Sequence, residues 1–129
     1  MNLFSKLKKM RILLIDNDEW IRDSLSLYFE GEGCHLLALE TAEEGIEVLK
    51  GQNYDIIMVD YRLPGMDGLE FLKRIQGPYP HTMKVLITAH KSKEVVSRAM
   101  KIGVDSFIEK PFTTRNIEES LSRLIAKSE

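Results

Sequence analysis

The sequence has little of what would mark a secreted, membrane-bound or nucleic-acid-binding protein. Its single cysteine, Cys34, excludes an internal disulfide and favours a reducing compartment such as the cytoplasm. No apolar run approaches the roughly 18 residues that a membrane span requires. The 18 basic and 20 acidic residues give a net charge of −2, without the strongly basic face that nucleic-acid binding needs. We therefore expect neither a membrane nor a nucleic acid among the partners.

The length limits the number of domains. The chain has 129 residues, enough for one domain and too few for two ordinary ones. Its basic start, MNLFSKLKKM, is not followed by the apolar segment and small-residue cleavage site of a signal peptide. We expect residues 1–9 to be a short basic extension exposed to solvent, with a tail that binds a membrane or a partner as the alternative. Residues 10–127 should form the domain.

Short apolar runs alternate with segments of helical periodicity along the whole chain. The runs that predict strands cover residues 11–15, 36–39, 56–59, 83–87 and 106–108. Five helical segments are expected after these runs; Thr41 and Glu44 have the spacing of a capping box at the start of one of them. Continuous apolar strands joined by helices indicate an α/β fold, a doubly wound parallel sheet covered on both faces.

Polar residues mark the ends of four of the predicted strands. These residues are Asp16, Asp60, Thr88 and Lys110. In an open parallel α/β sheet, ligands bind beyond the carboxyl ends of the strands, so the four side chains should meet at one edge. A carboxylate can accept a phosphoryl group as a nucleophile, and a lysine and a hydroxyl can contact the transferred oxygens. The acids could hold Mg²⁺, which prefers oxygen ligands.

At these residues the chain resembles a response-regulator receiver domain, the CheY-like family of two-component signalling. The resemblance covers nearly all of the sequence from Met10 to about Ala126. It is carried by LLID, by VDYRLPGMDG around Asp60, by LITA, and by SFIEKPF, which contains Lys110 and Pro111. The resemblance implies a flavodoxin-like (βα)5 fold with strand order 2-1-3-4-5, and a Lys110–Pro111 bond that is commonly cis in the family.

The resemblance also implies how the domain would work. Asp60 would take a phosphoryl group from a sensor histidine kinase or a phosphotransfer protein. Thr88, the amide N–H of Ala89 and Lys110 would contact that group. The chain would be an enzyme only in catalysing its own Mg²⁺-dependent phosphorylation and dephosphorylation, and it would signal to an unknown downstream protein by contact.

A metal site is implied as well, with one departure from the family. Asp16 would contact Mg²⁺ through water, while Asp60 and the backbone carbonyl of Arg62 would complete the site. Most members have a second acid that binds the ion directly, where this chain has Asn17. An amide oxygen can bind Mg²⁺, but without a formal charge. Asp18 is a further candidate ligand, with capping of the following helix as the alternative.

The family's switch involves Thr88 and the aromatic position, here Phe107. Movement of Thr88 toward the phosphoryl group would open space for the Phe107 ring to turn inward. Because Phe107 has no phenolic hydroxyl, we predict a switch driven by packing and biased inward even before phosphorylation. The surface that changes should cover residues 92–126.

Two other functions stay open at this point. A phosphohydrolase of the haloacid dehalogenase type would use Asp16 as the nucleophile and Asp18 as the acid/base, with Thr88 and Lys110 in support. No second acidic motif follows Lys110, however, and VDYRLPGMDG would be unexplained. A degenerate receiver that only binds proteins is the other alternative, because Asn17 in place of an acid could make the metal site too weak for phosphotransfer.

Overall fold

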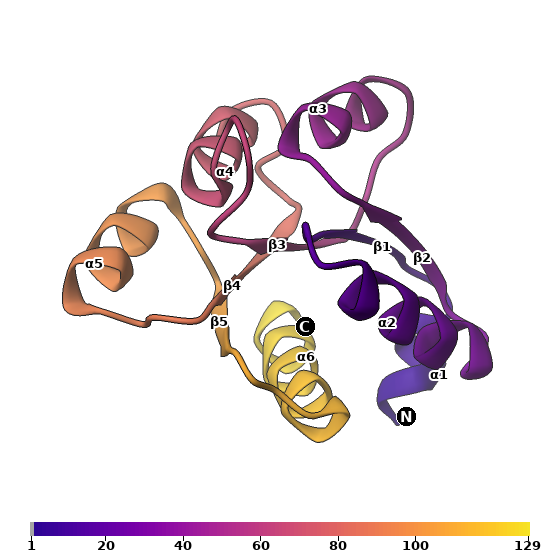
Figure 1. Cartoon of the computed structure of the whole chain (residues 1–129). Coiled ribbons are helices and arrows are strands. Elements are labelled where there is room, and N and C mark those ends of the chain that lie inside the picture. Colours follow the sequence, from indigo (N-terminus) through magenta and orange to yellow (C-terminus); the bar gives the residue numbers. More distant parts are fainter. Residues whose placement is uncertain (1) are drawn as a thin grey trace.

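The computed structural model describes residues 2–129 and has one five-stranded parallel sheet at its centre (Figure 1). The strand order is β2-β1-β3-β4-β5, with the crossover after β2 that the resemblance implies. The strands are β1 (Arg11–Ile15), β2 (His35–Leu39), β3 (Ile56–Asp60), β4 (Met83–Thr88) and β5 (Ser106–Glu109). The helices are α1 (Leu3–Leu7), α2 (Glu19–Gly31), α3 (Ala42–Gly51), α4 (Gly68–Gln76), α5 (Lys93–Ile102) and α6 (Thr114–Ser128). The predicted fold class and strand order are confirmed.

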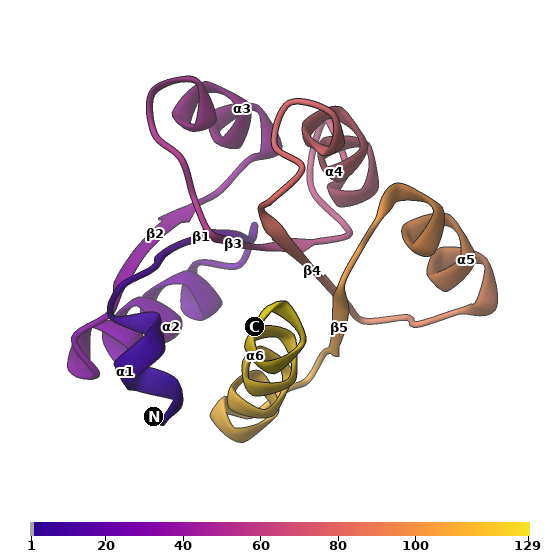
Figure 2. The same cartoon turned by 180° about the vertical axis from the view of Figure 1, so that it is seen from behind.

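The helices cover both faces of the sheet, and each face has its own apolar core. Figures 1 and 2 show α1, α2 and α6 on one side of the sheet and α3, α4 and α5 on the other. Successive residues of a strand point to opposite faces. Leu14 of β1 therefore belongs to the same buried cluster as Phe29 of α2, while Leu13 belongs to the cluster on the other face, with Phe71 of α4. A strand buried on both faces must be apolar throughout, which is why periodicity along β1 and β3 is absent.

The helix starts follow the capping rules. Thr41 and Glu44 form the predicted capping box at the start of α3, each accepting a backbone N–H of the other. Asp67 accepts the N–H of Glu70 and so caps α4. These caps fix where each helix begins, and thus where the connections at the carboxyl edge of the sheet end.

Asn2, Lys8 and Lys9 are exposed as expected, but the structure corrects the expectation for residues 3–7. They form α1, in which Leu7 is fully buried and Phe4 meets the ring of Tyr28 from α2 edge-on, at a centroid distance of 6.1 Å. Lys6 forms an ion pair with Glu129, just beyond the end of α6. The apolar stripe of this one-turn helix covers the core between α2 and α6 because burial of apolar area outweighs the basic character of the segment.

None of the helices formed by residues 2–129 is long and apolar enough to cross a membrane.

Candidate functional site

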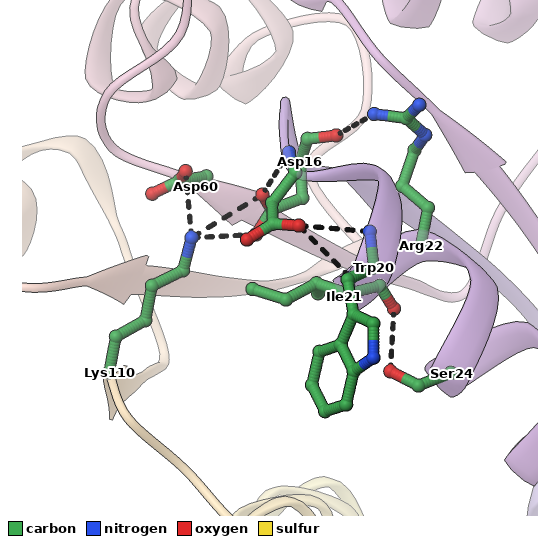
Figure 3. A network of polar contacts seen from close by, with 8 residues as sticks. Asp16, Trp20, Ile21, Arg22, Ser24, Asp60 and Lys110 are labelled. Carbon is green, nitrogen blue, oxygen red and sulfur yellow. Dashed lines mark hydrogen bonds and ion pairs between the residues drawn. The ribbon is translucent and has the colours of Figure 1, made fainter.

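Three of the four polar strand-end residues, Asp16, Asp60 and Lys110, meet at the carboxyl edge of the sheet. β1 and β3 are neighbours, so Asp16 and Asp60 lie side by side, and Lys110 reaches them from the end of β5 (Figure 3). Lys110 Nζ lies 3.0 Å from Asp60 Oδ2 and donates a hydrogen bond to it. The same ammonium donates to Asp16 Oδ1 at 3.3 Å and forms an ion pair with Asp16 Oδ2 at 3.0 Å. One cation thus bridges two carboxylates.

Both carboxylates are buried, and this affects their protonation. Asp16 has no exposed surface and Asp60 is 7% exposed. Burial raises the pKa of the Asp60 carboxyl above its usual value, the neighbouring Asp16 raises it further, and Lys110 only partly opposes these effects. Burial works against the charge on Lys110, but its contacts with Asp16 and Asp60 outweigh burial and raise its pKa. The site therefore holds a strongly charged lysine and an aspartate whose ionised form is disfavoured.

Gly68 allows α4 to start directly against the Asp60 backbone. A Cβ at Gly68 would lie 2.3 Å from the Asp60 carbonyl oxygen, closer than any real contact allows. The N–H of Gly68 instead donates to the carbonyl oxygen of Tyr61 at 2.9 Å. The last residue of VDYRLPGMDG is thus a glycine for steric reasons, and it sets the position of the loop after Asp60.

The loop that follows β1 is held at several points. The N–H of Asp18 donates to Asp16 Oδ1 at 2.9 Å. Asp18 Oδ1 accepts the N–H groups of Trp20 and Ile21, so Asp18 caps α2. Asn17 lies between these anchored residues, with an exposed side chain that makes no hydrogen bond to residues 2–129.

Arg22 is a site residue that the sequence reading missed. Its Nη1 donates to the backbone carbonyl of Asp16 at 2.9 Å, as Figure 3 shows. The sequence does indicate this contact, because Arg22 lies one helical turn after the N-cap Asp18. Long side chains on a helix point back toward the N-terminus of that helix, which here is the end of β1. Arg22 joins α2 to the end of β1 and so helps to fix the loop that carries Asn17.

The oxygen atoms present fit a Mg²⁺ ion. Asp16 Oδ2 is buried and pairs with Lys110, but it accepts no hydrogen bond from residues 2–129, so its lone pairs could bind a cation. No cluster of three or more His, Cys, Asp or Glu side chains in residues 2–129 could hold a metal ion. Mg²⁺ does not need one, because it usually binds one or two carboxylates and keeps several waters. Two like charges on buried carboxylates also favour a bound cation.

The remaining predicted residues lie on the side of β4 and β5. Thr88 is buried; its Oγ1 accepts the N–H of His90 at 3.1 Å and donates to the His90 carbonyl at 3.2 Å. Ala89 is exposed at the end of β4, and the Lys110–Pro111 bond is cis. Phe107 is half-buried against the core that contains Phe71.

The chain matches a family model and several curated proteins. The model, described as response regulator receiver domain, matches residues 12–122. The transcriptional regulatory protein FixJ of Bradyrhizobium diazoefficiens is 32% identical over 124 residues, which cover 94% of this chain and 59% of that protein. A cyclic di-GMP phosphodiesterase of Thermotoga maritima is 30% identical over 102 residues, 79% of this chain and 27% of that protein. The chain thus spans less than two thirds of the length of these relatives.

Solved structures show the same fold. A CheY-like response regulator receiver domain protein from Methanospirillum hungatei JF-1 superposes with a TM-score of 0.82 at 30% identity, covering 92% of this chain and 98% of that one. The non-phosphorylated HemR receiver domain of Leptospira biflexa superposes with a TM-score of 0.84 at 25% identity, covering 91% and 94% of the two chains.

Replacing Asp60 with asparagine should raise the melting temperature at neutral pH without Mg²⁺. A carboxyl whose pKa is raised by folding destabilises the folded chain above that raised pKa, and this effect disappears as pH falls below the unfolded value of about 3.9. The asparagine oxygen can still accept from Lys110. Thermal unfolding at several pH values, with exposed Asp23→Asn as the control, measures the effect. An Asp60→Asn variant less stable than the parent at neutral pH would contradict it.

Replacing Arg22 with methionine should lower the free energy of unfolding by about 1–3 kcal/mol, since a charged donor leaves the Asp16 carbonyl without its partner. Methionine keeps much of the apolar stem. Urea unfolding gives the value, and Arg115→Met serves as the control because Arg115 is exposed and pairs only with Glu119 among the described residues. An equal loss in both variants would show that the contact with Asp16 contributes nothing.

Proposed function

The chain belongs to the response-regulator receiver family, and we propose that its Asp60 accepts a phosphoryl group from a sensor histidine kinase or a phosphotransfer protein in the cytoplasm. The observation that carries the proposal is the convergence of Asp60 with Lys110, whose Nζ lies 3.0 Å from Asp60 Oδ2. A nucleophile and the cation that can stabilise the transferred group are thus already in contact. Asp16 and Thr88 flank them at the same edge of the sheet.

The transfer can be written for the residues of this chain. An Asp60 oxygen forms a bond to phosphorus while the bond between phosphorus and the phosphohistidine nitrogen breaks, and the imidazole keeps the electron pair and takes up a proton. Lys110 can follow the phosphoryl oxygens because its ammonium is a point charge on a flexible stem. The Thr88 hydroxyl can turn from His90 toward the phosphoryl group, and the N–H of exposed Ala89 can donate to it.

Mg²⁺ would be held by Asp16, Asn17, Asp60 and the backbone carbonyl of Arg62. When bound, the ion would supply the positive charge that the phosphoryl oxygens need beyond Lys110. Arg22 and Asp18 would act indirectly, by holding the loop in which Asn17 lies. The proposed self-phosphorylation and self-dephosphorylation would both depend on this ion.

The proposed output is a change of the face formed by α5, β5 and α6, through which the domain would contact its downstream partner. Thr88 and Phe107 would couple this face to Asp60, because they lie on adjacent strands and Phe107 pairs with Leu86 of β4. A ligand can shift such an equilibrium only if it distinguishes the two states. The inward bias of Phe107 before phosphorylation stays a prediction, as the ring is half-buried.

One observation favours a second function, a receiver that binds partners without being phosphorylated. Asn17 removes one formal charge from the expected metal site, which weakens the case for phosphotransfer. Against this, Asp60, Thr88 and Lys110 keep the chemistry and the geometry that phosphotransfer needs. A dehalogenase-type reaction at Asp16 is disfavoured by its complete burial.

Incubation with acetyl phosphate and Mg²⁺ should phosphorylate Asp60. The expected product has one added phosphoryl group, bound as an acyl phosphate that hydroxylamine cleaves. Intact-mass analysis before and after hydroxylamine treatment detects it. Asp60→Asn is the matched control, because it preserves the size of the side chain and removes the nucleophile. Equal labelling of the two proteins would contradict the assignment of Asp60 as the acceptor. No labelling of the parent protein would favour a receiver that binds partners without being phosphorylated.

Replacing Asn17 with aspartate should tighten Mg²⁺ binding roughly ten- to a hundredfold, because a charge–charge contact replaces a charge–dipole contact near the protein surface. Trp20 is 76% exposed and its backbone N–H donates to Asp18 beside the site, so its fluorescence can follow the titration. Calorimetry on the same pair of proteins checks the result. An unchanged affinity would show that a carboxylate at position 17 does not contribute to Mg²⁺ binding.

A further inference from the structure

A lysine covers the ring of Phe107, and neither the sequence nor the family's switch accounts for it. Lys91 follows the end of β4 by three residues, and its Nζ lies 5.4 Å from the centroid of the Phe107 ring. An ammonium within about 6 Å of a ring centroid is attracted to the face of the ring. The ion pairs formed by residues 2–129 do not include Lys91, so its charge is not committed to a carboxylate.

The backbone beside Lys91 is held by the hydroxyl of Thr88. Thr88 Oγ1 accepts the His90 N–H and donates to the His90 carbonyl, which also accepts the N–H of Ser92 at 3.0 Å. Ser92 in turn caps α5 by accepting the N–H of Val95. Lys91 therefore lies between two anchored residues, and one of the anchors is the hydroxyl that would contact a phosphoryl group.

We propose that Lys91 is the residue through which Thr88 controls the position of Phe107; this proposal rests on the proposed function. In the resting domain, Thr88 holds His90, and the Lys91 ammonium stabilises the ring in its half-buried position. When the Thr88 hydroxyl turns to the phosphoryl group, the two bonds to His90 are lost, the short loop is released, and the cation leaves the ring. The ring is then free to change its packing.

This contact changes the expectation for a phenylalanine at the switch position. Without a phenolic hydroxyl, the ring cannot be held by a hydrogen bond, so packing alone would favour the inward position. A cation on the ring face supplies a stabilisation that needs no hydroxyl. Lys91 therefore opposes the inward bias in the resting state, and its removal should increase the inward population.

The resting-state test replaces Lys91 with methionine, which keeps an apolar stem of similar length and removes the charge. NMR of the full chain with labelled phenylalanine should show the Phe107 ring population shifted toward the beryllofluoride-bound form, roughly two- to fivefold. The control is Lys93→Met, at an exposed lysine two residues further along. If Lys91→Met moves the Phe107 signals no more than Lys93→Met does, the contact does not hold the ring.

The coupling is tested on Lys91 itself. Its Cε protons should be shifted upfield by the ring in the parent protein and not in Phe107→Leu. Thr88→Val, which keeps the shape and loses the hydroxyl, should abolish most of that upfield shift. Retention of the shift in Thr88→Val would overturn the role of Thr88, whether or not Asp60 is ever phosphorylated.

Binding of beryllofluoride with Mg²⁺ should reduce the upfield shift of the Lys91 Cε protons, as Thr88→Val does. Bound fluoride signals without any change at Lys91 would overturn the coupling and leave the proposed function intact. Absence of bound fluoride would instead count against the proposed function, and the Thr88→Val and Lys91→Met variants would still decide the role of Lys91.

Discussion

The contact between Lys110 and two buried carboxylates is the interaction on which the site depends. Asp16 and Asp60 end neighbouring strands, so the parallel sheet forces two like charges together in a place from which water is largely excluded. Such an arrangement is costly unless a cation neutralises it. Lys110 does so from the end of β5, with contacts of 3.0 Å to each aspartate. In the resting domain the Lys110 ammonium is already paired with Asp16 and Asp60. A transferred phosphoryl group would have to compete with these carboxylates for it.

Asn17 fits this electrostatic arrangement. A third carboxylate at this position would add negative charge beside Asp16 and Asp60, with Lys110 as their shared partner. The amide avoids that repulsion in the resting state, but it would also attract a divalent cation less than a carboxylate would. If the ion binds here, metal affinity and resting stability would be opposed at this position, and the amide would favour the resting state.

Much of the fold and the centre of the site follow from the sequence, while the contacts around the centre do not. The strands and Asp60, Thr88 and Lys110 are predictable because each polar residue lies at the end of an apolar run or one residue beyond it, and parallel strands share one carboxyl edge. α1 was missed because a single turn is too short for periodicity to reveal, and its burial depends on where α2 and α6 leave space. Arg22 and Lys91 were missed since each acts through a contact that only the three-dimensional arrangement creates.

The two sides of Asp60 differ in how firmly they are held, and this difference would give a phosphoryl signal its direction. Toward α4, Gly68 touches the Asp60 carbonyl so closely that no side-chain atom could be inserted, and Asp67 fixes the helix start. Closely packed groups cannot move without loss of many contacts. Toward α5, the loop after β4 is held by two hydrogen bonds to Thr88, and a phosphoryl oxygen could take the His90 carbonyl's place as acceptor for the Thr88 hydroxyl. A new charge on Asp60 would therefore displace the loop before α5 in preference to α4, and the change would appear on the face formed by α5, β5 and α6.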